Sequence, residues 1–124
     1  MKFSIDKQEK YSLITLDEEK LDSTISPFLK SEFITLNAEG FRNIILDLSK
    51  TKFSDSSGLS AILVANRLCT GDDGVFVLTG LTDHVNKLVK ISQLDTVLNI
   101  LPKIEEAVDT VFMHELERSL KNEE

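Results

Sequence analysis

The order of apolar and polar positions predicts a chain in which strands and helices alternate. Segments 3–5 and 11–16 are short and rich in apolar residues, and the polar stretch 6–10 between them predicts an N-terminal β-hairpin. Longer apolar runs, of the kind found in strands covered on both faces, come later in the chain. These strand candidates are 44–48, 75–78 and 97–100.

Apolar residues at helical spacing fill the intervals between these strands. The first helix begins either at Ser23 or at Ser26, with Pro27 in its first turn. It ends at Gly40, a residue type that commonly follows the last turn of a helix. The second helix covers 59–69 and is apolar almost all round, so it is expected to be buried.

The last third of the chain adds two more helices. One begins at Thr82 or Asp83, and Pro102 opens the other. The final helix has one apolar stripe, which we expect to face the core: Ile104, Val108, Val111, Phe112 and Leu116. Beyond this helix, 121–124 are expected to fray.

Helices that alternate with strands favour an α/β fold in which neighbouring strands are parallel. We expect a mixed, mostly parallel central sheet of about five strands, about four helices and the N-terminal β-hairpin. The 124 residues have the size of one domain, and the sequence shows no linker, repeat or low-complexity stretch. The expected organisation is therefore a single domain over 1–124.

Charge and cysteine content narrow the function classes. With 14 Lys and Arg against 21 Asp and Glu, the formal net charge is −7, so neither a nucleic acid nor an anionic membrane is an expected partner. The single cysteine, Cys69, cannot form an internal disulfide, which fits a reducing compartment. No apolar run approaches the ~18 residues of a membrane-spanning helix. We expect a cytoplasmic protein without membrane insertion.

The stretch Asp55-Ser56-Ser57-Gly58-Leu59 lies where a buried strand gives way to the buried second helix. Hydroxyl groups at a helix N-terminus commonly act as caps. The same position also favours a phosphate, because N–H groups without helical partners and the positive end of the helix dipole attract an anion. The residues alone therefore leave two interpretations open, a structural cap and a serine that is modified.

Enzymatic chemistry finds little support. The segment Asp55-Ser56-Ser57-Gly58 lacks the leading glycine of a Gly-x-Ser-x-Gly elbow, and the sequence has no phosphate-binding glycine motif. A hydrolase that used Ser56 would need a base, for which His84 is the one candidate. His84 and His114 lie on different expected helices as solvated residues, and with Cys69 they do not make a metal site of standard spacing. We expect no enzyme, no cofactor and no metal.

A family resemblance rests on two segments joined by a short loop, Ile44-Ile45-Leu46-Asp47-Leu48 and Phe53-Ser54-Asp55-Ser56-Ser57-Gly58-Leu59. Together they resemble the central signature of the STAS domain, most closely that of bacterial anti-sigma factor antagonists. Weaker matches extend the resemblance over nearly the whole chain, at Leu21-Asp22, Gly80-Leu81-Thr82 and Ile91-Ser92-Gln93-Leu94. The chain departs from the family at Asp17-Glu18-Glu19-Lys20, where many members carry a Gly-containing turn.

The resemblance implies a protein that binds an anti-sigma factor with serine kinase activity and thereby frees a sigma factor. In such proteins the kinase phosphorylates the first serine after the signature aspartate, which is Ser56 here, with Ser57 as the alternative. A PP2C-type phosphatase removes the phosphate. The residues expected to bind the partner surround this serine: Asp22, Ser23, Thr24, Asp55, Ser56, Ser57, Gly58 and Leu59.

A second interpretation is kept beside this one. The chain would then be a STAS interaction module without a phosphorylation switch, acting as a scaffold or as a soluble subunit of a transport system. The intact serine pair after Asp55 favours the first interpretation. A homodimer is left open, since no long exposed apolar stripe in the sequence demands one.

Overall fold

A computed structural model describes residues 1–122, within which five strands form the main sheet in the order β1-β2-β4-β6-β7. These strands are β1 (Phe3–Lys7), β2 (Ser12–Leu16), β4 (Ile44–Asp47), β6 (Phe76–Thr79) and β7 (Asn99–Leu101). Two short strands, β3 (Lys20–Leu21) and β5 (Phe53–Ser54), form a separate pair. The helices are α1 (Ser26–Ala38), α2 (Ser56–Gly71), α3 (Asp83–Ile91) and α4 (Ile104–Asn122), with the 3-10 turn η1 (Leu94–Thr96) between α3 and β7.

Strand pairing in the main sheet is mixed and mostly parallel, as expected. β1 runs antiparallel to β2, with Ile5 opposite Ile14, which confirms the N-terminal hairpin. β2, β4, β6 and β7 follow as parallel neighbours. The five strands of this sheet and the four helices within residues 1–122 confirm the predicted α/β fold.

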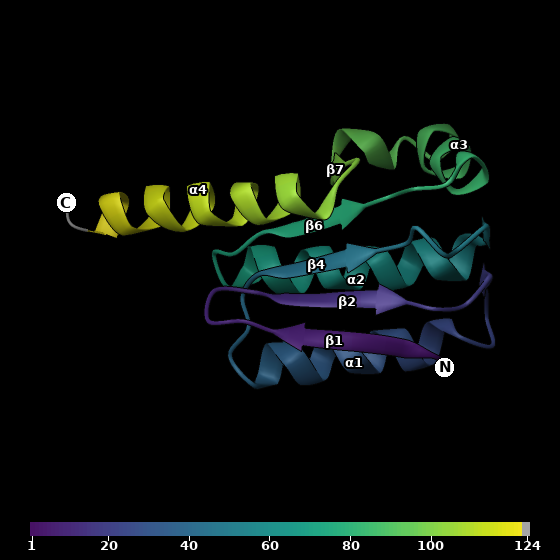
Figure 1. Ribbon diagram of the computed structural model, residues 1–124, viewed down its shortest axis with the longest axis horizontal. Coiled ribbons are helices and arrows are strands. Elements are labelled where there is room, and N and C mark those ends of the chain that lie inside the picture. Colours follow the sequence, from purple (N-terminus) through teal and green to yellow (C-terminus); the bar gives the residue numbers. More distant parts are fainter. Residues whose placement is uncertain (123–124) are drawn as a thin grey trace.

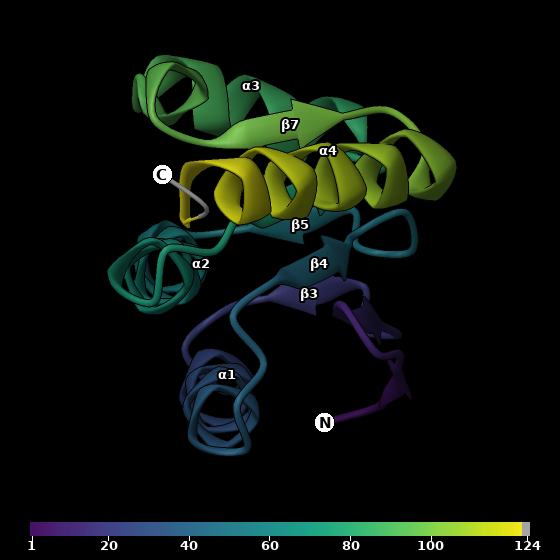
Figure 2. The ribbon, with the colours of Figure 1, turned by 90° about the vertical axis from the view of Figure 1, so that its left-hand side faces the viewer.

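Helices cover both faces of the sheet. Successive side chains of a strand point to opposite faces, so Ile44 and Leu46 of β4 join the core under α1, α2 and α3, while Ile45 joins the core under α4. Figure 2, viewed from one end of the sheet, shows α1 and α2 together on one side of the strands. On that side Phe33 and Phe76 meet edge to face, with 5.9 Å between their ring centroids.

The last strand differs from its expected position. It covers Asn99–Leu101 rather than 97–100, because Val97 still forms the end of η1 and is exposed. The side-chain amide of Asn99 donates to the carbonyl of Phe76, 3.3 Å away, where the new strand joins β6. The apolar run therefore predicted the existence of the strand but not where it begins.

Two helix starts are set by residues outside the apolar pattern. α2 begins at Ser56, ahead of the apolar segment 59–69, because Asp55 caps it. α1 begins at Ser26, one of the two expected starts, but Ser26 is its first helical residue, and Ile25 occupies the cap position without a side-chain hydrogen bond.

Of the apolar stripe expected to face the core from α4, only Val111 is buried, and Ile104 and Val108 are half-buried. Ala107 and Val111 are fully buried, whereas Phe112 is 50% exposed and Leu116 is 53% exposed. The prediction was wrong for these two residues, because the face turned toward the sheet continues from Val111 to the polar Glu115. Figure 1 shows the second half of α4 extending past the ends of the strands.

The end of the chain was expected to fray over 121–124. Lys121 and Asn122 belong to α4, and 123–124 lie outside the described residues. Within residues 1–122, no helix combines the length and the apolar character needed to cross a membrane.

Candidate functional site

The small β3–β5 pair joins the two loops that carry the predicted site residues. β3 and β5 run parallel, with Leu21 opposite Ser54. The carbonyl of Leu21 accepts hydrogen bonds from the N–H of Asp55, at 3.2 Å, and from the hydroxyl of Ser54, at 3.1 Å. Asp22 and Asp55, each the residue after its strand, are thereby brought close together at the end of the sheet where α1 and α2 begin (Figure 1).

The segment Asp17–Lys20, where the chain departs from the family pattern, is held by the connection between β4 and β5. The carbonyl of Glu19 accepts a hydrogen bond from the N–H of Lys52 at 2.8 Å. The hydroxyl of Thr51 donates to the carbonyl of Glu18 at 2.9 Å. These contacts fix the path by which the chain enters β3 and reaches the site.

Asp55 is the N-cap of α2. Its Oδ1 atom accepts hydrogen bonds from the N–H groups of Ser57, at 2.9 Å, and Gly58, at 3.2 Å, and from the Ser57 hydroxyl, at 2.6 Å. The Ser57 hydroxyl is the main cause that lowers the pKa of Asp55 below its ordinary value, with burial acting against it and backbone N–H groups adding to it. Two of the N–H groups expected to attract a phosphate are therefore already bound to a carboxylate.

The two adjacent serines have different surroundings. Ser57 is half-buried, and its hydroxyl lies 2.6 Å from Asp55 Oδ1 and 3.0 Å from the hydroxyl of Ser26. Ser56 is exposed, and its side chain makes no hydrogen bond to any other part of residues 1–122. The structure thus uses Ser57 in the cap network and leaves the Ser56 hydroxyl open to solvent.

Asp22 organises the entry into α1. Its Oδ1 atom accepts from the hydroxyl of Thr24, at 2.6 Å, and from the Thr24 N–H, at 3.0 Å. These two bonds lower the pKa of Asp22, while burial and the negative charge of Asp55 act in the opposite direction. Ser23 and Thr24 are exposed. The predicted residues Asp22, Ser23 and Thr24 therefore border the same surface as Ser56.

Gly58 and Leu59 lie beneath this surface, since both are buried. A Cβ atom on Gly58 would stand 2.8 Å from both the Cγ atom and the carbonyl oxygen of Leu21, and it would also overlap the hydroxyl of Ser54. The missing side chain lets the first turn of α2 approach the β3–β5 pair closely. The position of Gly58 and Leu59 assigns them to packing under the site, and their direct contact with a partner stays a prediction.

Sequence reasoning missed two contacts at the border of the site. Phe53 is 42% exposed, and its ring meets the ring of the exposed His84 edge to face, with centroids 5.1 Å apart. Ser26 is buried and completes the hydroxyl pair with Ser57. Each contact joins residues far apart in the chain, and neither leaves a periodic or motif signal that could have predicted it.

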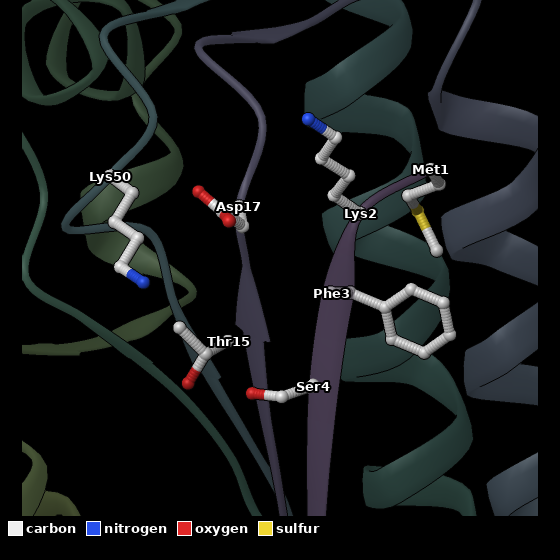
Figure 3. A pocket seen from close by; sticks show the side chains of 7 residues that line it. All are labelled: Met1, Lys2, Phe3, Ser4, Thr15, Asp17 and Lys50. Carbon is white, nitrogen blue, oxygen red and sulfur yellow. The ribbon is translucent and has the colours of Figure 1, made fainter.

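A separate open pocket of about 370 Å³ lies beside the start of β1. Figure 3 shows Asp17 between Lys2 and Lys50 at this pocket, with Thr15 and Ser4 on the adjoining strands. None of the predicted site residues lines it. In the part of the chain that the structure describes, no group of three or more His, Cys, Asp or Glu residues is placed to hold a metal ion. The candidate site is thus the exposed surface around Ser56.

Comparison with known proteins adds a family and a set of similar folds. The family model of the STAS domain matches residues 2–107. The chain is 17% identical to an anti-sigma factor antagonist from Mycobacterium paratuberculosis, with a TM-score of 0.79 over 89% of this chain and 92% of that one. It is 23% identical to the phosphorylated form of the Bacillus cell fate determinant SpoIIAA, with a TM-score of 0.69 over 89% of this chain and 99% of that one.

The same fold also occurs in a protein that belongs to a transporter family. The chain is 14% identical to a sulfate transporter family protein from Wolinella succinogenes, with a TM-score of 0.74 over 86% of this chain and 88% of that one. At such identities the likeness to solved structures establishes the fold alone.

Proposed function

The chain belongs to the STAS domain family, and from this we propose that it is an anti-sigma factor antagonist whose binding is switched off by phosphorylation of Ser56. The observation that carries the proposal is the exposed Ser56 hydroxyl at the first position of α2, directly after Asp55, whose carboxylate lies close enough to that of Asp22 for the two charges to interact. Structural similarity to SpoIIAA, a protein described in a phosphorylated form, supports it. The chain acts as a binding module and not as an enzyme.

Ser56 is favoured over Ser57 because of the hydrogen bonds each hydroxyl makes. A kinase needs the acceptor oxygen free for in-line attack on the γ-phosphorus of ATP. The Ser57 oxygen is engaged by Asp55 and Ser26, so its modification would break the α2 cap and the contact with α1. The Ser56 hydroxyl can be reached without moving another group.

The reaction at Ser56 is an ordinary phosphoryl transfer. The Ser56 oxygen forms a bond to the γ-phosphorus of ATP, a basic group of the kinase accepts the hydroxyl proton, and the bond between the γ-phosphorus and ADP breaks. The enzyme that performs it is the partner itself, an anti-sigma factor with serine kinase activity. A PP2C-type phosphatase reverses it with water, releasing inorganic phosphate and restoring the hydroxyl. All of these steps take place in the cytoplasm.

The phosphate acts on the complex rather than on the fold. A phosphoserine carries about −1.5 to −2 charges at neutral pH, and the N-terminus of α2 tolerates an anion. The new charge lies next to Asp22 and Asp55, on the surface that Ser23 and Thr24 border. Loss of a contact at the centre of an interface reduces the binding free energy by on the order of 2–4 kcal/mol. One phosphate on Ser56 can therefore weaken the complex with the kinase by roughly 30- to 1000-fold.

The experiment incubates the protein with ATP and with each anti-sigma serine kinase encoded in its genome, then maps phosphate by mass spectrometry. We expect one phosphate on Ser56 in the wild type, none in Ser56→Ala, and continued labelling of Ser56 in Ser57→Ala. A wild-type protein that stays unmodified on both serines in the presence of kinases active on other substrates defeats the proposal.

A binding measurement separates the surface mechanism from a change of fold. Ser56→Asp should weaken the complex with the kinase while the melting temperature stays within about 1 °C of the wild type, because the side chain at this position is exposed. Ser56→Asn is the matched control, of similar size and without charge. Equal binding by all three proteins would contradict the electrostatic switch.

A second candidate function is favoured by one observation, the shared fold with a sulfate transporter family protein. In that case the chain is a STAS interaction module without a switch, used as a scaffold or as a subunit of a transport system. Its neighbouring genes separate the two cases, since a serine kinase or a phosphatase gene accompanies a switch and a transporter gene accompanies the module. Stable binding to such a transporter, unaffected by Ser56→Asp, would favour this second function.

A further inference from the structure

The outer side of α4 carries an apolar ridge. Besides the half-exposed Phe112 and Leu116, Met113 is 56% exposed and Leu120 is 56% exposed. Phe112, Leu116 and Leu120 are spaced four residues apart, which places them one above another on the same face of a helix. These four residues are called the α4 ridge below.

Contacts on the inner side hold α4 with this ridge outward. Ala107 and Val111 pack against the sheet. Further along, the carboxylate of Glu115 accepts a hydrogen bond from the buried Asn43 at 2.7 Å. His114 Nε2 lies 2.9 Å from the carbonyl oxygen of Asp73, within hydrogen-bond distance. These contacts fix the rotation of α4 about its axis. The α4 ridge is therefore exposed in the isolated chain and cannot turn toward the sheet without breaking them.

The α4 ridge also lies outside the segment shared with the family. The STAS family model ends at residue 107, and every residue of the ridge follows it. The ridge is at the end of the sheet opposite to Ser56, because α2 begins at one end and the second half of α4 extends past the other (Figure 1). Its use is therefore separate from the proposed phosphorylation switch.

The two flanks of the ridge have opposite charge. On one flank, Lys10 and Arg42 border a groove that Phe112 and Leu116 also line. Glu115 lines it too and lies 3.6 Å from Arg42, so the charge of Arg42 is balanced within the chain and the positive charge of this flank rests on Lys10. On the other flank, Glu117 borders a groove next to Met113. Lys10 is positioned there because its carbonyl oxygen accepts a hydrogen bond from Asn43 at 2.8 Å.

We propose that the α4 ridge pairs with the α4 ridge of a second copy of this chain, in a parallel two-fold dimer. In a parallel pair related by a two-fold axis, opposite flanks of the two helices meet, so the Lys10 flank of one copy faces the Glu117 flank of the other on both sides. An antiparallel pair would bring each flank against the same flank of the other copy, so that Lys10 would face Lys10 and Glu117 would face Glu117. The pairing of Lys10 with Glu117 on both sides therefore favours a second copy of this chain, in the parallel direction.

The exposed area predicts a weak dimer. An aromatic side chain buries about 150–250 Å² when fully covered, and Leu and Met are somewhat smaller, so four half-exposed side chains offer roughly 300–400 Å² per copy. Two such surfaces give a total near the lower limit of specific interfaces, about 1,000 Å² once flanking side chains are included. We expect a dissociation constant on the order of tens of micromolar. In the parallel arrangement both Ser56 sites lie at the same end of the dimer, free of the interface.

Sedimentation equilibrium of the full chain, from about 1 μM to about 500 μM, tests the dimer, and charge reversal tests its direction. Lys10→Glu and Glu117→Lys should each weaken self-association by about tenfold or more, whereas an equimolar mixture of the two should associate at least as well as the wild type. Lys87→Glu, the same change on exposed α3, is the matched control and should have no effect. A protein that remains monomeric over the whole range overturns the proposal.

Disulfide trapping provides an independent test of direction. Cys69 is fully buried, so a cysteine introduced on the ridge is the reactive one. In the parallel dimer Phe112→Cys should form a disulfide with its own copy on mild oxidation. An antiparallel pair would instead cross-link Phe112→Cys with Leu120→Cys in a mixture and leave Phe112→Cys alone uncross-linked. That second pattern overturns the parallel arrangement even if the protein is dimeric.

Discussion

The hydroxyl oxygens of Ser26 and Ser57 lie 3.0 Å apart, and this contact joins the first turn of α1 to the first turn of α2. The Ser26 oxygen also lies 2.7 Å from the carbonyl oxygen of Asp22, and the Ser57 oxygen lies 2.6 Å from Asp55 Oδ1, so the two hydroxyl protons are shared among three short contacts. Contacts of these two hydroxyl groups therefore connect the loop of Asp22 with the loop of Asp55, next to the exposed Ser56. The site is organised before any partner arrives.

Alanine substitutions at Ser56 and Ser57 should distinguish the serine that stabilises the fold from the serine that is exposed for phosphorylation. Ser57→Ala removes the hydroxyl from Asp55 and from the buried Ser26, so the free energy of unfolding should fall by about 1–2 kcal/mol. Ser56→Ala removes an exposed hydroxyl with no hydrogen bond inside the described residues and should change it by less than about 0.5 kcal/mol. Urea denaturation followed by circular dichroism measures both. A larger loss in Ser56→Ala than in Ser57→Ala would contradict the assignment.

The two ends of α2 offer a matched pair of glycine substitutions. Gly58→Ala would place a Cβ 2.8 Å from the carbonyl oxygen of Leu21, so the β3–β5 pair must shift, at a cost of about 1–3 kcal/mol. Gly71→Ala, where a Cβ has no neighbour within 4 Å, should leave stability unchanged or raise it by up to about 1 kcal/mol. Thermal unfolding of the two variants provides the comparison. A stabilised Gly58→Ala would show that the close approach of α2 to β3 is not required.

Much of the fold could be predicted because its signals are local. A strand covered on both faces has to be apolar at nearly every position, so 44–48 identified β4 directly. The hairpin left a different local signal, two short apolar segments, 3–5 and 11–16, separated by a polar stretch. The β3–β5 pair left no such signal, because two-residue strands are too short for any period to be visible.

The prediction for α4 failed for a different physical reason. Helical spacing shows which residues share a face, but Val111, Phe112 and Leu116 cover more of the helix circumference than one contact with a sheet can bury. The buried Asn43 fixes the rotation by binding Glu115, a contact between residues far apart in sequence. Composition alone cannot indicate that a carboxylate rather than Leu116 faces inward.

The position of the candidate site could be predicted from the sequence. Which serine is exposed and which residue caps α2 could not. The placement of Asp55 and Ser56 between a strand and a helix already indicated a helix start at the end of the sheet. Which of Ser56 and Ser57 is free depends on Ser26, whose place beside Ser57 only the folded chain shows. The use of Asp55 as the cap likewise follows from the geometry of the first turn of α2.

Cys69 should resist thiol reagents in the native protein. It is fully buried, and this burial raises the pKa of its thiol to about 12, so almost no thiolate is present at pH 8. We expect labelling by a disulfide reagent only as fast as the protein opens, and complete labelling at once in denaturant. Rapid reaction of the native wild type would show that the core between α2 and β4 opens readily.

Acid stability should reflect the cap at Asp55. The Ser57 hydroxyl lowers the pKa of Asp55 below its ordinary 3.8, so the charged carboxylate stabilises the folded state above that value. This contribution is lost as the pH falls from about 3.8 through the lower pKa of the folded state. Asp55→Asn keeps an oxygen that can accept from Ser57 and Gly58, so it should differ little from the wild type at pH 7.

The wild type and Asp55→Asn should therefore have similar stability at neutral pH but differ in how steeply the free energy of unfolding depends on pH. Urea denaturation at intervals from pH 7 to about pH 2.5 should show a steeper loss of unfolding free energy below pH ~4 in the wild type than in Asp55→Asn. Because Asp55 is solvent-exposed, solvent screening keeps the difference modest. Parallel curves over the whole range would mean that the Ser57 hydroxyl does not discriminate between the charged and the neutral carboxyl group, and that the α2 cap is held by geometry alone.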